Sequence, residues 1–165
     1  KKIAREMIKM TGNINQNISG LNRGEDHQYT QVQCKTCHRG QANPFMIEQV
    51  MDEAISDGGT MAAQAKYNEL KEQYYGGHTY DFTGFTLAEY ANSLSNDNID
   101  NALSMAQFGV ENYPGEPYAH TILGNVYLKL GKPADAIKAY QASLAIDPEQ
   151  GGVKSQLEAA KKAME

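Results

Sequence analysis

Residues 123–148, LGNVYLKLGKPADAIKAYQASLAIDP, carry the clearest structural pattern in the chain. Their apolar side chains recur at helical spacing on both sides of Gly131, a residue type that commonly ends a helix. Part of this pattern also occurs 34 residues earlier, in four similar pairs: Leu94 and Leu128, Ala102 and Ala136, Leu103 and Ile137, and Pro114 and Pro148. The sequence therefore predicts two successive helical hairpins.

This period resembles that of the tetratricopeptide repeat (TPR), a helical hairpin of about 34 residues. The second copy has small or bulky residues where that repeat favours them: Leu123, Gly124, Tyr127, Gly131, Ala136, Tyr140 and Pro148. Small side chains let the paired helices approach closely, and a proline ends the second helix. The resemblance implies a TPR-like module over residues 86–165 that contacts other proteins.

The first copy departs from the repeat at two positions. Tyr90 stands where the repeat favours a glycine, and Ala106 stands where it favours an aromatic residue. Thr86 and Glu89 have the spacing of a capping box, which predicts that the first helix of this copy begins there. Residues 151–165 predict a last helix with a polar outer face, as the end of a solenoid requires.

The part of the chain before the repeats also has helical patterns. The first apolar stripe consists of Ile3, Met7, Met10, Ile14, Ile18 and Leu21. Gly12 and the Asn-rich residues 13–17 favour an early end of this helix, and residues 19–31 predict a loop. Two further stripes end at Asp57-Gly58-Gly59 and at Gly76-Gly77. Because no long segment alternates in polarity, the sequence predicts an all-α fold.

Residues 34–38, CKTCH, carry the chemistry. Two thiols at this spacing can add to the two vinyl groups of one haem, and the histidine that follows then faces the iron. The order matters, because the histidine must follow the second cysteine directly to reach under the ring. The motif predicts one covalently bound haem c, with Cys34 and Cys37 as thioethers and His38 as the proximal iron ligand.

The sequence also allows three other interpretations of the cysteine pair. A redox-active CxxC of the thioredoxin kind needs a strand–helix setting, and no strand is predicted. A structural zinc site needs a fourth ligand, for which His27 and His78 are candidates, and either could also compete for iron. A disulfide or a pair of free thiols needs no further residue. The contiguous CxxCH favours haem over all three.

The residues around the CxxCH motif carry a resemblance to a known family. They are REMIKMT at 5–11, Ile14-Asn15, and VQCKTCHRG at 32–40. They resemble one haem-binding segment of the tetrahaem cytochrome subunit of photosynthetic reaction centres, over roughly residues 3–44. The resemblance implies that a methionine on the preceding helix is the sixth iron ligand, and it favours Met7. Met10 lies on the same apolar face, so spacing alone leaves both open.

Several other residues have simpler interpretations. We expect Arg39 either to contact a haem propionate or to be solvated. We expect His120 to pack within the second repeat. Four methionines are expected in the core or against the haem rather than as ligands: Met46, Met51, Met61 and Met105.

Charge and length exclude some classes of function. The net charge of −5 disfavours nucleic acid as a partner, and no apolar run reaches the length of a membrane helix. The charge is uneven, because residues 1–45 carry seven basic and three acidic side chains and the other 120 carry eight basic and seventeen acidic. This asymmetry predicts two parts with different surfaces.

Together these observations predict a monohaem c-type cytochrome part over residues 1–85 and a TPR-like module over 86–165. We expect a one-electron carrier rather than an enzyme, with redox proteins or a second copy as partners. A peroxidase-like enzyme would need an open iron position. The alternative is a TPR scaffold in which haem is a sensor or a structural staple. Since c-type haem is attached outside the cytoplasm, we expect a periplasmic or extracellular protein. We expect the chain to be processed or truncated before Lys1, and a membrane anchor before Lys1 is one alternative.

Overall fold

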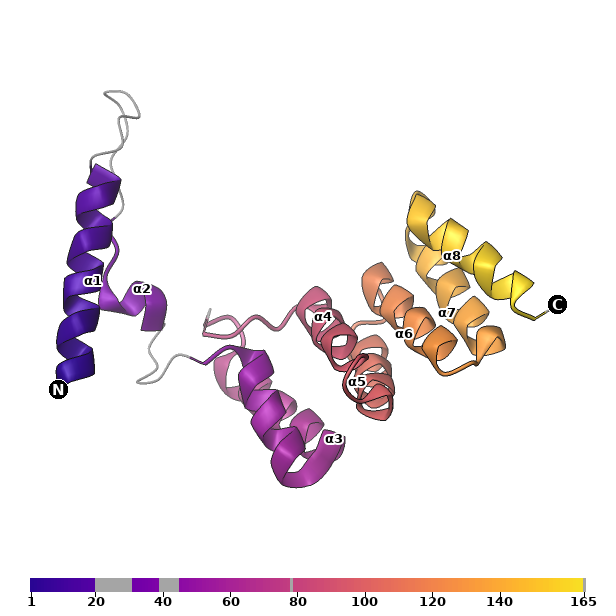
Figure 1. Ribbon diagram of the computed structural model, residues 1–165, viewed down its shortest axis with the longest axis horizontal. Helices are drawn as coiled ribbons and strands as arrows, with labels where there is room; N and C mark the ends of the chain where they lie inside the picture. The colour runs from indigo at the N-terminus through magenta and orange to yellow at the C-terminus, as the bar shows by residue number, and fades with distance from the viewer. Residues whose placement is uncertain (20–30, 39–44, 78, 165) are drawn as a thin grey trace. The chain divides into compact units, whose positions relative to one another are not determined.

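The computed structural model describes residues 1–19, 31–38, 45–77 and 79–164. Every regular element in those ranges is an α-helix, which confirms the predicted all-α class (Figure 1). The chain divides into two compact units, Lys1–Phe45 and Met46–Glu165. The predicted boundary between a haem-binding part and a TPR-like part, after residue 85, concerns function and stays a prediction.

The described part of the first unit contains two helices, α1 (Lys2–Ser19) and α2 (Cys34–His38). The expected early end of α1 is wrong, because the helix continues through Gly12 and the asparagines after it. A single glycine costs a helix about 1 kcal/mol relative to alanine, which does not by itself end a helix of eighteen residues. Most of the predicted loop at 19–31 lies outside the described residues.

The second unit contains six helices in its described part. They are α3 (Ile47–Tyr74), α4 (Gly84–Leu94), α5 (Ile99–Asn112), α6 (Pro117–Lys129), α7 (Pro133–Ile146) and α8 (Gly151–Lys162). Helices α4 and α5 pack against each other as one hairpin, and α6 and α7 form the next. Helix α5 contacts α6, which brings the two hairpins together, and α8 packs on α7. The two predicted hairpins and the closing helix are therefore present.

Helix α3 adds a third helical hairpin that the repeat pattern did not predict. Its backbone is not helical at Gly58 and Gly59, where Gly59 has a positive φ of 74°, and Figure 1 shows the chain folding back there. Residues of both arms, including Met51 and Tyr67, lie in one core with α4 and α5. Since a solenoid needs about three hairpins to be stable, α3 supplies what two repeats lack.

The predicted capping box at Thr86 and Glu89 is wrong. Helix α4 begins one turn earlier, with Thr83 as its N-cap, and the Thr83 hydroxyl accepts a hydrogen bond from the Thr86 backbone N–H at 3.2 Å. The Thr86 hydroxyl donates to an Asp81 carboxylate oxygen at 2.7 Å, while Glu89 accepts from the Tyr118 hydroxyl. Thr83 has the same capping chemistry and lies closer to the start of the buried helix face.

The core confirms some of the packing predictions and corrects others. Met51 and Met105 are fully buried, as expected, but Met46 and Met61 are exposed over 66% and 81% of their surface. One ring nitrogen of His120 lies 2.9 Å from the Pro114 carbonyl oxygen, so this histidine contacts the turn between two hairpins. Tyr90, at the position of the repeat's glycine, is buried, and its hydroxyl donates to Asp52 of α3 at 2.8 Å.

Gly124 provides a direct test of the packing in the second repeat. A Cβ atom at this position would lie 2.5 Å from the ring of Tyr140, which is fully buried and donates a hydrogen bond to Asn125. We expect Gly124→Ala to lower the free energy of unfolding by about 1–3 kcal/mol, as overpacked cores do. Gly115→Ala is the control, since its Cβ would have no neighbour within 4 Å. Equal stability of the two variants in urea unfolding would contradict this packing.

Candidate functional site

Helix α2 presents both thiols on a single turn. The helix begins with a local turn in which the Thr36 N–H donates to the Gln33 carbonyl at 2.9 Å. The Gln33 N–H donates in return to the Thr36 hydroxyl at 3.0 Å. Cys34 and Cys37 therefore lie three residues apart on one helical turn, both exposed and not joined in a disulfide. His38 follows directly and is half-buried.

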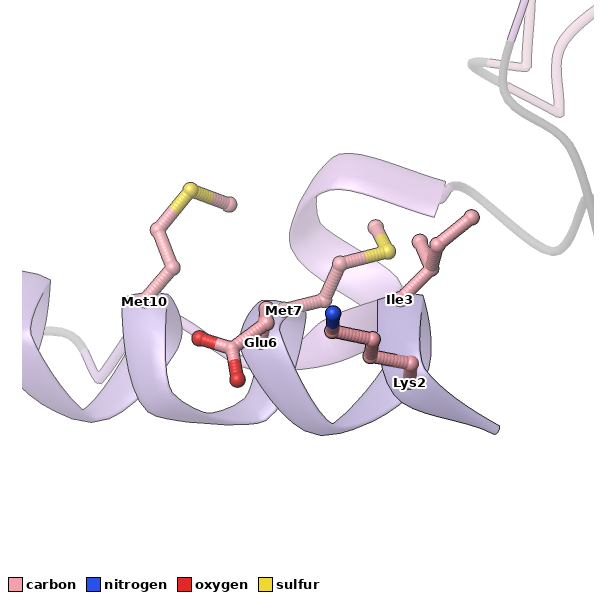
Figure 2. A pocket seen from close by; sticks show the side chains of 5 residues that line it. All are labelled: Lys2, Ile3, Glu6, Met7 and Met10. Atoms are coloured by element: carbon pink, nitrogen blue, oxygen red, sulfur yellow. The ribbon is translucent and has the colours of Figure 1, made fainter.

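Helix α1 of the same unit bears an open apolar pocket of about 460 Å³. It is lined by Lys2, Ile3, Glu6, Met7 and Met10. Figure 2 shows the side chains of Ile3, Met7 and Met10 rising from the same side of α1, so that both thioether sulfurs lie over the pocket. This volume is in the range typical of small-molecule and cofactor sites.

The two methionines differ in their surroundings. Met7 is half-buried, whereas Met10 is exposed over 50% of its surface. Figure 2 shows the α2 ribbon close to Met7, and Figure 1 shows α2 beside the same half of α1. Met7 is therefore the more protected of the two methionines, and both line the pocket.

The donor atoms fit a haem c. Two exposed thiols on one turn, an adjacent imidazole and an apolar pocket with two thioethers are the groups that such a cofactor needs. Arg39, His27 and His78 lie outside the described residues, so the predictions for them stay open. Within the described ranges no three His, Cys, Asp or Glu side chains cluster as a metal site would require.

One residue of the site was not assigned a role from the sequence. Asn15 of α1 hydrogen-bonds through its side chain to both backbone groups of Val32, two residues before Cys34. Asn15 is among the residues that resemble the reaction-centre cytochrome segment, but the resemblance gave it no role, and locally it is a polar residue beside Ile14 on the half-buried stripe of α1. Such a signal does not identify a partner seventeen residues away.

Two family models match the chain. The model described as photosynthetic reaction centre cytochrome C subunit matches residues 1–104, and the tetratricopeptide repeat model matches residues 117–150. Both resemblances inferred from the sequence are thereby confirmed. The cytochrome match is longer than the segment around CxxCH, because it continues through α3 and α4 into α5.

Among solved structures, the chain is similar to the first TPR domain of the human RPAP3 protein, with 15% identity and a TM-score of 0.49. That match covers 72% of this chain and 89% of the other. It is also similar to the first TPR of Spaghetti (RPAP3) bound to HSP90 peptide SRMEEVD, with 17% identity, a TM-score of 0.49, and coverage of 72% and 90%. A search of curated proteins finds no match. No helix in the described part of the chain is long and apolar enough to cross a membrane.

Proposed function

This chain belongs to the family of the photosynthetic reaction centre cytochrome c subunit, and from that premise we propose that it carries single electrons on one covalently bound haem c. The observation that carries the proposal is the presence, in one compact unit, of the CxxCH helix and of a pocket on α1 that two methionines line. Cys34 and Cys37 would hold the haem, and His38 and Met7 would be its axial ligands. Arg39 remains a candidate for a propionate contact.

A bound haem supplies an iron that changes reversibly between the ferrous and ferric states. The role of this chain would be to supply two iron ligands, His38 and Met7, so that the change of charge needs little movement of side chains. The thioether of Met7 is a neutral, soft ligand and favours the ferrous state, which raises the potential. The apolar side chains around it, among them Ile3, line that side of the open pocket and would pack against a bound haem.

The second unit suits a role in protein contact. It contains a tetratricopeptide repeat, and Met46–Glu165 holds seventeen acidic and eight basic side chains. Such an excess of negative charge favours a partner with a basic face and speeds its approach. We propose a redox partner protein or a second copy of this chain as the partner. The division after residue 85 is part of the proposal: residues 1–85 would be the haem-binding part and residues 86–165 the contact part, with α3 packed in the same core as α4 and α5.

We also propose that the protein is exported to the periplasm or the cell exterior. Covalent attachment of haem to CxxCH takes place outside the cytoplasm, and the proposed use of Cys34 and Cys37 therefore requires export. A chain made without an export signal should lack covalent haem. Covalent haem on such a chain would contradict this location.

Absorption spectra of the purified full chain in both redox states test the proposed function. We expect low-spin spectra in both states, a weak sulfur-to-iron band at the red edge of the ferric spectrum, and no rapid reaction with peroxide. A high-spin ferric spectrum with fast turnover of peroxide would indicate a peroxidase-like enzyme instead of an electron carrier. A low-spin haem that exchanges no electrons with small redox proteins would favour the scaffold alternative, in which haem is a sensor or structural staple.

A further inference from the structure

Asn15 forms a two-point clamp on the chain just before the CxxCH helix. Its Nδ2–H donates to the Val32 carbonyl oxygen at 2.8 Å, and its Oδ1 accepts from the Val32 N–H at 2.7 Å. Asn15 and Val32 are both half-buried. The clamp therefore satisfies both backbone groups of one residue with one side chain, at a place where water has restricted access.

An asparagine is one of the few residues that can do this. Its amide carries a donor and an acceptor on a short planar group, whereas an aspartate carries acceptors alone and an aliphatic side chain carries neither. The contact is not a helix cap or a local turn, because its partners are seventeen residues apart. It joins two segments that the sequence separates.

Each end of the clamp is tied to a ligand-bearing helix. Asn15 is part of α1, which carries Met7 eight residues earlier, about 12 Å along the helix axis. Val32 is followed by Gln33, whose N–H and carbonyl form the turn that begins α2 at Cys34. A shift at the clamp is therefore a shift of the methionine helix against the cysteine–histidine helix.

We propose that Asn15 is a positioning residue that fixes the register between α1 and α2, and thereby would hold the methionine proposed as sixth ligand in place to bind the haem iron. The inference rests on the proposed function, since register affects ligation when haem is bound. Asn15 takes no part in covalent attachment, which depends on the thiols of Cys34 and Cys37. Its loss should leave the haem attached and open the methionine side of the iron.

The experiment compares Asn15→Ala with Asn17→Ala in the full holoprotein. Asn17 is an exposed asparagine on the same helix, so its replacement makes the same chemical change without touching the clamp. We titrate ferric protein with imidazole and record the red-edge band and the midpoint potential. For Asn15→Ala we expect intact covalent haem, a weaker band, a lower potential and about tenfold tighter apparent imidazole binding, because the open fraction rises. Asn17→Ala should match the wild type.

Two further variants separate hydrogen bonding from packing. Asn15→Asp keeps the volume and the acceptor but faces the Val32 carbonyl with an oxygen, so it should open the iron as Asn15→Ala does. Val32→Ala removes a side chain but keeps both backbone groups, so it should retain the band. Helix content from circular dichroism shows whether α1 stays folded in each variant.

The outcomes are distinguishable. If the wild type has covalent haem and the red-edge band, and Asn15→Ala binds imidazole no more tightly than Asn17→Ala, the clamp does not position the ligand. If Val32→Ala loses the band as fully as Asn15→Ala while Asn15→Asp keeps it, packing and not the clamp sets the register. A wild type without covalent haem or without the band overturns the proposed ligand set, and the role of Asn15 with it.

Discussion

Met7→Ala should convert the ferric haem from low-spin to high-spin and let small ligands bind to the iron. Met7 is half-buried in the pocket on α1, and its sulfur lies on the side where α2 runs. If the methionine is off the iron about 1% of the time in the wild type, its removal should tighten apparent imidazole binding about 100-fold. The red-edge band should disappear and the midpoint potential should fall.

Met10→Ala is the matched control for that variant. It removes the same chemical group from the same pocket, but Met10 is half-exposed and one helical turn further along. We expect it to keep the low-spin spectrum and to change imidazole binding less than about threefold, since it removes a half-exposed side chain that lines the pocket but not the proposed iron ligand. A band that survives Met7→Ala and vanishes in Met10→Ala would assign the ligand to Met10.

Tyr67→Ala should destabilise the second unit by about 3–5 kcal/mol, the range for large aromatic side chains in cores. Tyr67 is 1% exposed, and its ring packs edge-on against Phe82 and Phe108, with centroid distances of 5.6 Å to each. Its hydroxyl oxygen lies 2.6 Å from that of Tyr113. These contacts join α3 to the TPR hairpins, so urea unfolding of the second unit should shift to much lower urea.

Two variants serve as controls for Tyr67→Ala. Tyr67→Phe keeps the ring and loses one hydrogen bond, so it should cost about 1 kcal/mol. Met61→Ala, on an exposed residue of the same helix, should cost less than about 0.5 kcal/mol. If Tyr67→Ala were as mild as Met61→Ala, α3 would not be part of the TPR core.

The repeat half of the fold could be predicted because its signal is local and periodic. Gly124 and Tyr140 occupy fixed places in a hairpin, and the structure packs one against the other. The α3 hairpin has the same architecture but not the same residues, so periodicity did not link it to the repeats. The start of α4 was misplaced because Thr83 and Thr86 have the same capping chemistry, and tertiary burial decides between them.

The candidate site divides in a similar way. Cys34, Cys37 and His38 lie within one motif of five residues, so their chemistry could be predicted from the sequence alone. The ranking of Met7 over Met10 came from the family resemblance, and their different burial agrees with it but does not test it. The clamp of Asn15 on Val32 could not be predicted, because a hydrogen bond across seventeen residues depends on how the chain returns to α1.

The central claim is that one haem is covalently bound through Cys34 and Cys37. The most direct measurement is acid–acetone extraction of the purified full chain followed by its intact mass. We expect the colour to stay with the polypeptide and the mass to exceed that of the polypeptide by one haem, and we expect the double variant Cys34→Ser, Cys37→Ser to lose this increment. Colour in the solvent, or a polypeptide mass without haem, would contradict the claim.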